Sequence, residues 1–349
     1  MLARLPRLPA LLLLVLALVW IAWATTLPIG TSAPPEPSHE VNGQPYGDIY
    51  LYHDIAARFA AGTPYYQAAA AVQRLHGYPT HPFLAIRLPT LAMIEVTLGF
   101  PALRVILPLL LAGAVATMIA ALDGVARFGE KLGATAGLVF GGALVGCALC
   151  GTSHELWAGL LVAAAVPLAS RGRWGSALAI GALALAIREL ALPMIALAGL
   201  YALLEGRRRQ AAAAALIGLA FVAALVVHAH FAAQVVLPGD ARSPGWLGLR
   251  GPAAPLADLA KNSLLGQMIQ PWCGLLAALP LVGWLGAPWR LARWAMPLVL
   301  GWFMLIAVCA RVDTTYWAII LLPLWCAGIG FVPRTLRDLV RAGLGRAPA

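Results

Sequence analysis

Apolar stretches close to the length of a membrane crossing recur along the whole chain, and they constrain its fold more than any other feature. They occupy residues 8–28, 101–122, 132–152, 156–170, 175–187, 190–204, 211–231, 272–287, 294–310 and 315–332. A spanning helix needs about 20 mainly apolar residues, so the shorter stretches should be tilted or flanked by snorkelling side chains. The sequence predicts one all-α, polytopic transmembrane domain over residues 1–349, with about ten transmembrane helices.

The composition supports this class. Hydrophobic residues make up 61% of the 349 residues and charged residues 11%, whereas soluble domains carry about a quarter charged residues. The net charge of +10 comes from short basic clusters between the apolar runs, which is typical of topology signals. We therefore expect membrane lipid as a partner and no nucleic acid.

The N-terminal apolar run has two interpretations. Arg4 and Arg7 precede it, and the tripeptide at 22–24 resembles a signal-peptidase site, which would fit a cleavable signal peptide. The run is long enough to span, however, and many further spans follow. These observations favour an uncleaved first helix.

The segment 83–98 decides the topology, because it is apolar but contains Arg87, Pro89 and Glu95. If it lies in, or re-enters, the outer interface, all the later basic clusters face the same side as Arg4 and Arg7. By the positive-inside tendency that side is the cytoplasm, and both termini lie there. These clusters are Arg127/Lys131, Arg171/Arg173, Arg207–Arg209, Arg290/Arg293 and Arg334/Arg337/Arg341/Arg346.

Two long loops then lie on the outer side. Residues 29–100 form the first, with interfacial helices, and residues 232–271 form the second, which reads as helical from Pro255 to Gln270. All seven histidines and five of the acids also lie in these loops or at the outer ends of helices. Ionisable residues in or beside a membrane are costly, so their convergence on one side suggests a function. These residues are His39, His53, His76, His81, His154, His228, His230, Asp48, Asp54, Glu155, Glu189 and Asp313.

The densest polar stretch follows the first span. As a helix it places Asp48, Tyr52, Ile55 and Phe59 on one face. Asp48 is either a helix N-cap following Gly47 or a functional carboxylate, and the sequence leaves both interpretations open.

Four short motifs resemble those of one family, the GT-C superfamily of membrane glycosyltransferases, and in particular its bacterial mannosyltransferase-like members. The motifs are Asp48-x-x-x-Tyr52 with Gly62-x-x-Tyr65, Tyr78-Pro79-Thr80-His81, Arg188-Glu189, and Arg311-x-Asp313-x-x-Tyr316-Trp317. Thr80 stands where the family has a second proline, which weakens the match there. The resemblance implies a periplasm-facing site in the bacterial inner membrane and transfer of one sugar from a polyprenyl-phosphate donor to an acceptor.

The resemblance also implies roles for individual residues. Asp48 takes the position of the general base that deprotonates the acceptor hydroxyl. Arg188, Arg311 and His81 are the candidates for binding the donor phosphate. Further substrate-binding candidates are Tyr52, Tyr65, His154, Glu155, Glu189 and Asp313.

Each assignment has a simpler alternative. Arg188 could pair locally with Glu189, Arg311 could be an anchor beside Asp313, and His81 could cap a turn. No complete metal-binding motif occurs, and Cys147-x-x-Cys150 is only half of one. The resemblance requires no cofactor, although some relatives use a divalent metal ion.

Two other functions compete with the enzyme. One is a transporter or flippase of a lipid-linked or amphiphilic substrate, and the other is a non-catalytic membrane assembly subunit. Transporters usually contain internal repeats and polar groups near the membrane midplane. This chain shows no repeat and gathers its charges on one face, which favours the glycosyltransferase.

Overall fold

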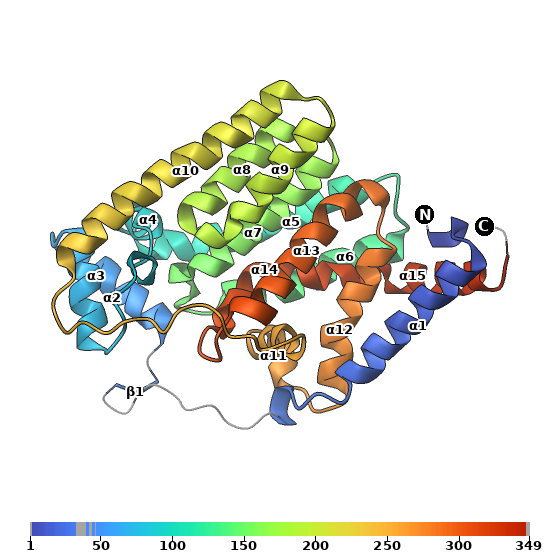
Figure 1. The fold of residues 1–349 in the computed structure, drawn as a ribbon, viewed down its shortest axis with the longest axis horizontal. Coiled ribbons are helices and arrows are strands. Elements are labelled where there is room, and N and C mark those ends of the chain that lie inside the picture. The colour runs from blue at the N-terminus through green and yellow to red at the C-terminus, as the bar shows by residue number, and fades with distance from the viewer. Residues whose placement is uncertain (1, 33–39, 42–43, 46, 347–349) are drawn as a thin grey trace.

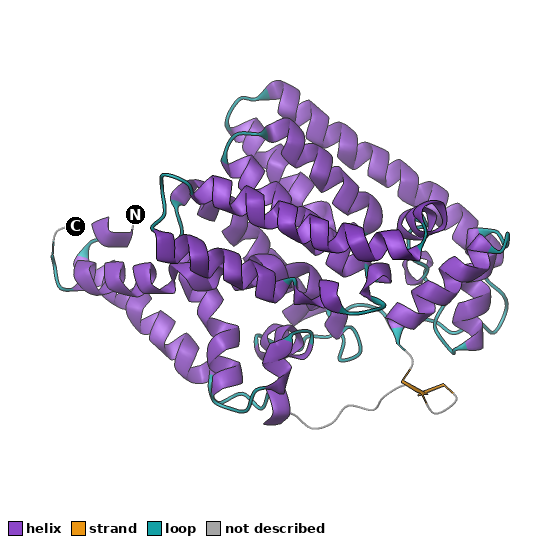
Figure 2. Ribbon diagram, turned by 180° about the vertical axis from the view of Figure 1, so that it is seen from behind, coloured by secondary structure: helices purple, strands orange, loops and turns teal. Residues whose placement is uncertain are grey.

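The computed structural model describes residues 2–32, 40–41, 44–45 and 47–346. In this part of the chain, helices joined by loops make up the fold, together with one two-residue antiparallel strand pair (Figure 2). The pair consists of β1 (Glu40–Val41) and β2 (Gln44–Pro45). The α-helices are α1 (Arg7–Ala24), α2 (Asp48–Ala60), α3 (Tyr65–Leu75), α4 (Thr90–Leu98), α5 (Phe100–Leu122), α6 (Phe128–Gly141), α7 (His154–Ser170), α8 (Trp174–Ile187), α9 (Leu192–Leu204), α10 (Arg208–Val235), α11 (Ala253–Lys261), α12 (Trp272–Leu285), α13 (Trp289–Cys309), α14 (Ala318–Ala327) and α15 (Val332–Gly343).

Among the described residues, five helical segments are long and apolar enough to cross a membrane. They are α1, α5, α10, α13 and the continuous stretch Thr315–Gly343, which contains α14 and α15. Shorter apolar helices cover His154–Ser170, Trp174–Ile187, Glu189–Leu204 and Trp272–Leu285. The all-helical class is confirmed, whereas the number of crossings remains a prediction.

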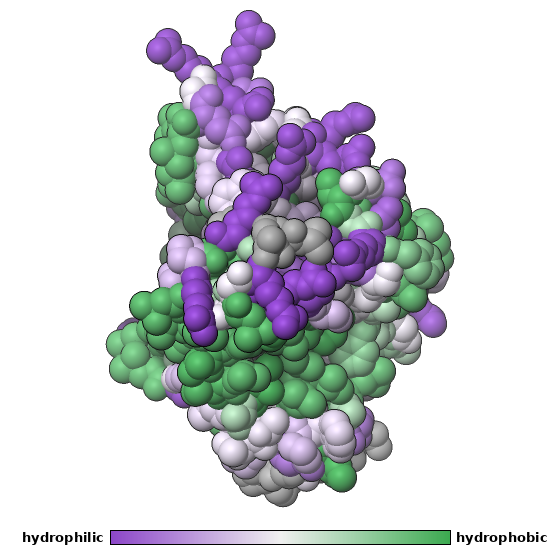
Figure 3. Space-filling view, turned by 90° about the vertical axis from the view of Figure 1, so that its right-hand side faces the viewer, coloured by the Kyte–Doolittle hydropathy of each residue, from purple (hydrophilic) through white to green (hydrophobic). Residues whose placement is uncertain are grey.

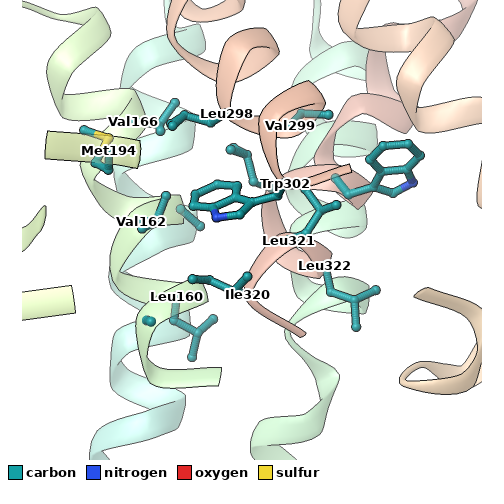
Figure 4. Packing of buried hydrophobic residues seen from close by; sticks show 14 of the residues in the cluster. Leu160, Val162, Val166, Met194, Leu298, Val299, Trp302, Ile320, Leu321 and Leu322 are labelled. Atoms are coloured by element: carbon teal, nitrogen blue, oxygen red, sulfur yellow. The ribbon is translucent and has the colours of Figure 1, made fainter. Parts of the chain in front are cut away.

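The core is built around α7 and α14, which are buried on almost every side. Helix α7 packs against α5, α8, α13 and α14. Figure 4 shows Leu160 and Val162 of α7 near Ile320 of α14 and Trp302 of α13. Helices that are apolar all round belong in such an interior. By contrast, α10 leaves Leu216, among other large apolar side chains, exposed along its length, as a lipid-facing helix does.

Helix α1 belongs to the bundle. It packs against α12 and α15, and Ala10, Ala17 and Ala24 are buried in these contacts. The Trp20 indole donates a hydrogen bond to the Ala278 carbonyl at 3.1 Å. The uncleaved first helix remains a prediction.

The two ends of the molecule differ. Helices α2, α3 and α4 lie at the end opposite the two termini (Figure 1). Helix α4 has nine residues, fewer than half of the about 20 that a span requires, so it fits the interfacial segment expected at 83–98. An ion pair of 2.7 Å between Arg74 and Asp240 joins the two segments expected to form the outer loops, 29–100 and 232–271.

One expectation about the second loop is wrong. The helix expected from Pro255 to Gln270 ends at Lys261, and a separate 3-10 turn follows over Leu264–Gln267. The break occurs at Asn262 and Ser263, whose side chains donate hydrogen bonds to backbone carbonyls of α11. Such side-chain bonds compete with continued helix.

Glycines let α6 approach the last helical stretch closely. Gly133, Gly137 and Gly141 are spaced four apart, and a methyl group on Gly137 would overlap the carbonyl of Cys326. Small residues at such spacing are how membrane helices pack backbone to backbone.

We therefore expect Gly137→Ala to destabilise the fold by about 1–3 kcal/mol through overpacking. Gly129→Ala, in the same helix but facing open space, should be neutral or stabilising by up to about 1 kcal/mol. Equilibrium unfolding of both variants in mixed micelles measures the difference. Equal stability of the two would contradict this packing.

Candidate active site

A cavity of about 590 Å³ opens at the end of the molecule that holds α2 and α3. Its volume lies within the range of about 300–1,000 Å³ typical of small-molecule sites. Five separate segments line it: the start of α2, the connection from α3 to α4, the connection from α8 to α9, residues 243–246 and the segment from the end of α13 to residue 317. In the topology expected from the sequence, the first four of these segments lie on the outer side. The fifth begins at the outer end of the predicted span 294–310.

Asp48 faces this cavity from the first turn of α2. Gly47 is the N-cap and Asp48 is the first residue of α2, so the N-cap interpretation of Asp48 is wrong by one residue. The hydroxyl of Tyr52, one turn later, lies 3.4 Å from the Asp48 carboxylate, and Tyr78 also hydrogen-bonds to it. Burial raises the pKa of Asp48, and the positive charge of Arg87 partly opposes that rise.

Arg87 is the centre of the polar network. Its Nε donates to the Tyr52 hydroxyl at 2.7 Å and its Nη2 to the Tyr316 hydroxyl at 3.2 Å. The guanidinium also lies 3.6 Å from the Glu155 carboxylate and 3.9 Å from that of Glu189. Because four side chains fix it, Arg87 presents a pre-oriented positive charge beside Asp48.

Arg188 is almost completely buried, with 1% of its surface exposed. Its Nε donates to Glu155 at 2.7 Å, and its Nη1 pairs with the neighbouring Glu189. Glu155 therefore bridges Arg87 and Arg188. The local Arg188–Glu189 pair exists, but it is part of a larger buried network that borders the cavity.

Arg311 is anchored on the other side of the cavity. Its Nε and Nη2 donate hydrogen bonds of 2.9 and 3.0 Å to the two carboxylate oxygens of Asp313. Its Nη1 donates hydrogen bonds to the Ser243 hydroxyl and the Gly245 carbonyl. Arg311, Asp313 and Ser243 all line the cavity. These contacts favour the anchor interpretation, because Arg311 holds residues 243–245 against the start of the last helical stretch.

Four predicted site residues do not line this cavity: Glu155, whose contacts are given above, His81, Tyr65 and His154. His81 borders a different hollow with Phe83 and α10. Tyr65 lies behind the cavity wall and donates its hydroxyl to the Arg87 carbonyl at 2.7 Å. His154 is buried with its ring edge against Tyr52, at 4.7 Å between ring centres. Tyr65 and His154 can support the wall of the site but do not line it.

The cavity contains residues that the sequence analysis did not choose. Arg87, Tyr78 and Tyr316 line it together with Asp48. An arginine within an apolar segment is costly, and that signal could have singled out Arg87. Glu95, the other ionisable residue of segment 83–98, pairs with His53 at 3.1 Å and does not line this cavity.

The six described histidines of the predicted outer side lie in different surroundings. His228 is buried and bonds to Tyr66, whereas His230 is bound to Gln234 at the exposed face of α10. His39 lies outside the described residues. Within the residues that the structure describes, no group of three or more His, Cys, Asp or Glu side chains is placed to hold a metal ion.

Comparisons of the chain with protein-family models, with curated proteins and with solved structures give no match.

Proposed function

We propose that this protein is a membrane glycosyltransferase that transfers one sugar from a polyprenyl-phosphate donor to an acceptor hydroxyl. The observation that carries the proposal is the shared cavity, which exposes Asp48 beside Arg87 and Arg188. A carboxylate for proton removal and fixed guanidinium groups for a phosphate leaving group are the two elements that such a transfer requires.

In the proposed reaction, Asp48 accepts the proton of the acceptor hydroxyl. The oxygen attacks the anomeric carbon of the donor sugar, the bond from that carbon to the phosphate oxygen breaks, and the lipid phosphate leaves with the bonding electrons. Arg87 and Arg188 stabilise its growing negative charge. Arg311 shapes the far wall through residues 243–245.

The charges of the cavity bear on how it would hold the donor. Its lining contains Arg87, Arg188 and Arg311 against Asp48, Glu189 and Asp313 when all are ionised. Three positive and three negative groups give no net attractive field. Phosphate binding must therefore depend on the local orientation of the guanidinium groups, which planar donors provide.

The decisive experiment incubates the purified protein with labelled polyprenyl-phosphate sugars and a membrane extract, followed by mass analysis of the products. A new glycosylated product supports the enzyme. Movement of the intact lipid-linked sugar between vesicle leaflets, with no new glycosidic bond, would instead establish the transporter.

The pH dependence offers a further test. Asp48 must be ionised to act as base, and burial raises its pKa above the ordinary aspartate value of about 3.9. The value of kcat/KM should therefore fall as the pH falls through this raised pKa, with its acid limb above pH 4. Activity that stays constant down to pH 4 would contradict a buried Asp48 as base.

We also propose ten spans in the bacterial inner membrane with both termini cytoplasmic. The segments assigned to the two sides line different cavities at different ends of the molecule, which supports this topology. Cysteine substituted at Arg208 should react only from the cytoplasm, and cysteine at Pro238 only from outside, with the parent chain giving the background of the native cysteines. Labelling of position 208 from outside would reverse the topology after residue 98.

A further inference from the structure

A second, larger cavity lies at the end of the molecule that carries the two termini, and the glycosyltransferase proposal does not use it. Its volume is about 830 Å³. It is formed where the start of the chain, the α5–α6, α7–α8 and α12–α13 connections and helix α15 meet. Figure 3 shows this end of the molecule, where hydrophilic side chains gather above a hydrophobic band.

The charge of this cavity is strongly one-sided. Seven arginines and two aspartates line it, whereas the outer cavity has equal numbers of positive and negative groups. Both aspartates already have partners, because Asp123 pairs with Lys131 at 2.7 Å and Asp338 pairs with Arg337 at 3.1 Å. The excess positive charge is therefore not neutralised by the cavity's own acids.

The arginines fall into two groups. Arg334 pairs with Glu130, Arg337 with Asp338, and Arg171 donates to the Ala120 carbonyl. Within the described part of the chain, no carboxylate forms an ion pair with the remaining four. They are Arg127, Arg173, Arg290 and Arg341.

Positive-inside topology alone does not require this arrangement. Arg208 and Arg209 belong to a basic cluster on the same predicted side, yet they do not line the cavity. By contrast, Arg127, Arg173, Arg290 and Arg341 come from four distant parts of the sequence and converge on one hollow. Unpaired like charges brought together in this way are stabilised when an anion binds between them.

The chemistry of the ligand follows from the guanidinium groups and the rim. Guanidinium groups bind phosphate oxygens through paired hydrogen bonds. The rim is partly apolar, with Leu2, Leu285 and the exposed Trp289, a residue type that favours the membrane interface. Basic pockets between the cytoplasmic ends of spanning helices are suited to anionic lipid headgroups.

We propose that this cavity binds phosphate groups, and that their source is the headgroup of an anionic phospholipid. Free phosphate has the same chemistry and is the alternative source. The site lies apart from the outer cavity, so its occupancy does not depend on the glycosyltransferase proposal.

The test measures binding to delipidated, full-length protein in neutral detergent by native mass spectrometry. The probes are diphosphatidylglycerol, phosphatidylcholine and inorganic phosphate. We expect diphosphatidylglycerol to bind and phosphatidylcholine not to bind at the same concentration. Saturable binding of inorganic phosphate alone, with no added affinity for the lipid, would assign the site to free phosphate.

The matched variants are Arg173→Gln/Arg290→Gln inside the cavity and Arg208→Gln/Arg209→Gln outside it. The first should weaken binding of the anionic ligand about 25-fold, or about fivefold for each arginine, and the second less than twofold. Equal weakening by both pairs, or no binding of either anionic probe by the parent protein, would overturn the proposal. If the first variant does not fold, the single variant Arg341→Gln replaces it, with an expected fivefold loss.

Discussion

Replacing Asp48 by asparagine should reduce the rate of sugar transfer about 10²–10⁴-fold, the usual cost of removing a positioned general base. Asparagine has nearly the same shape but cannot take the proton of the acceptor hydroxyl. Initial rates with a labelled polyprenyl-phosphate sugar, measured at saturating donor, give the change directly.

The stability of this variant should stay close to that of the parent protein. Gly47, not Asp48, occupies the N-cap of α2, so the substitution leaves the cap residue unchanged. Because burial disfavours its charged form, as the raised pKa indicates, a neutral amide at this position removes a desolvation cost. A large loss of activity with an unchanged unfolding midpoint therefore separates a chemical role from a structural one.

Asp54→Asn provides the matched control, because Asp54 lies in the same helix but does not line the cavity. Its rate should remain within a few-fold of the parent rate. If the Asp48 variant retains full activity, or if both variants lose it equally, Asp48 is not the base and the proposed reaction loses its central residue.

The helices were predictable because each apolar run marks a segment that avoids water. The segment 101–122 corresponds closely to α5, Phe100–Leu122. The segment 132–152 corresponds less well, because α6 ends at Gly141 and the apolar run continues into 3-10 turns. Hydropathy records burial, not hydrogen bonding, so it cannot locate where a helix ends inside an apolar region.

The candidate site was predictable only in outline. The gathering of histidines and acids on one predicted side indicated where a site would lie, and the family resemblance selected Asp48, Arg188 and Arg311, all of which line one cavity. Their partners come from segments far apart in sequence, such as Ser243 for Arg311. Arg87 was missed because its apolar neighbours indicated an interfacial segment, and no local pattern shows which buried carboxylates will meet it.

The second large effect concerns the buried network behind the cavity. Replacing Arg188 by methionine should lower the free energy of unfolding by up to about 3–5 kcal/mol, because breaking a buried ion pair removes the closest partner of a buried charge. The charge left behind is Glu155, of which 2% of the surface is exposed. Arg87, at 3.6 Å, is its remaining cationic neighbour in the described structure. Equilibrium unfolding in mixed micelles measures the loss.

Lys131→Met is a suitable control, because Lys131 pairs at 2.7 Å with Asp123, whose side chain is 77% exposed. Exposed pairs contribute at most about 1 kcal/mol, so this variant should remain near the parent stability. The double variant Arg188→Met/Glu155→Leu should be more stable than Arg188→Met alone, since it also removes the stranded carboxylate. If the double variant is instead less stable than the single one, Glu155 is held mainly by Arg87, and Arg188 is not the residue that neutralises it.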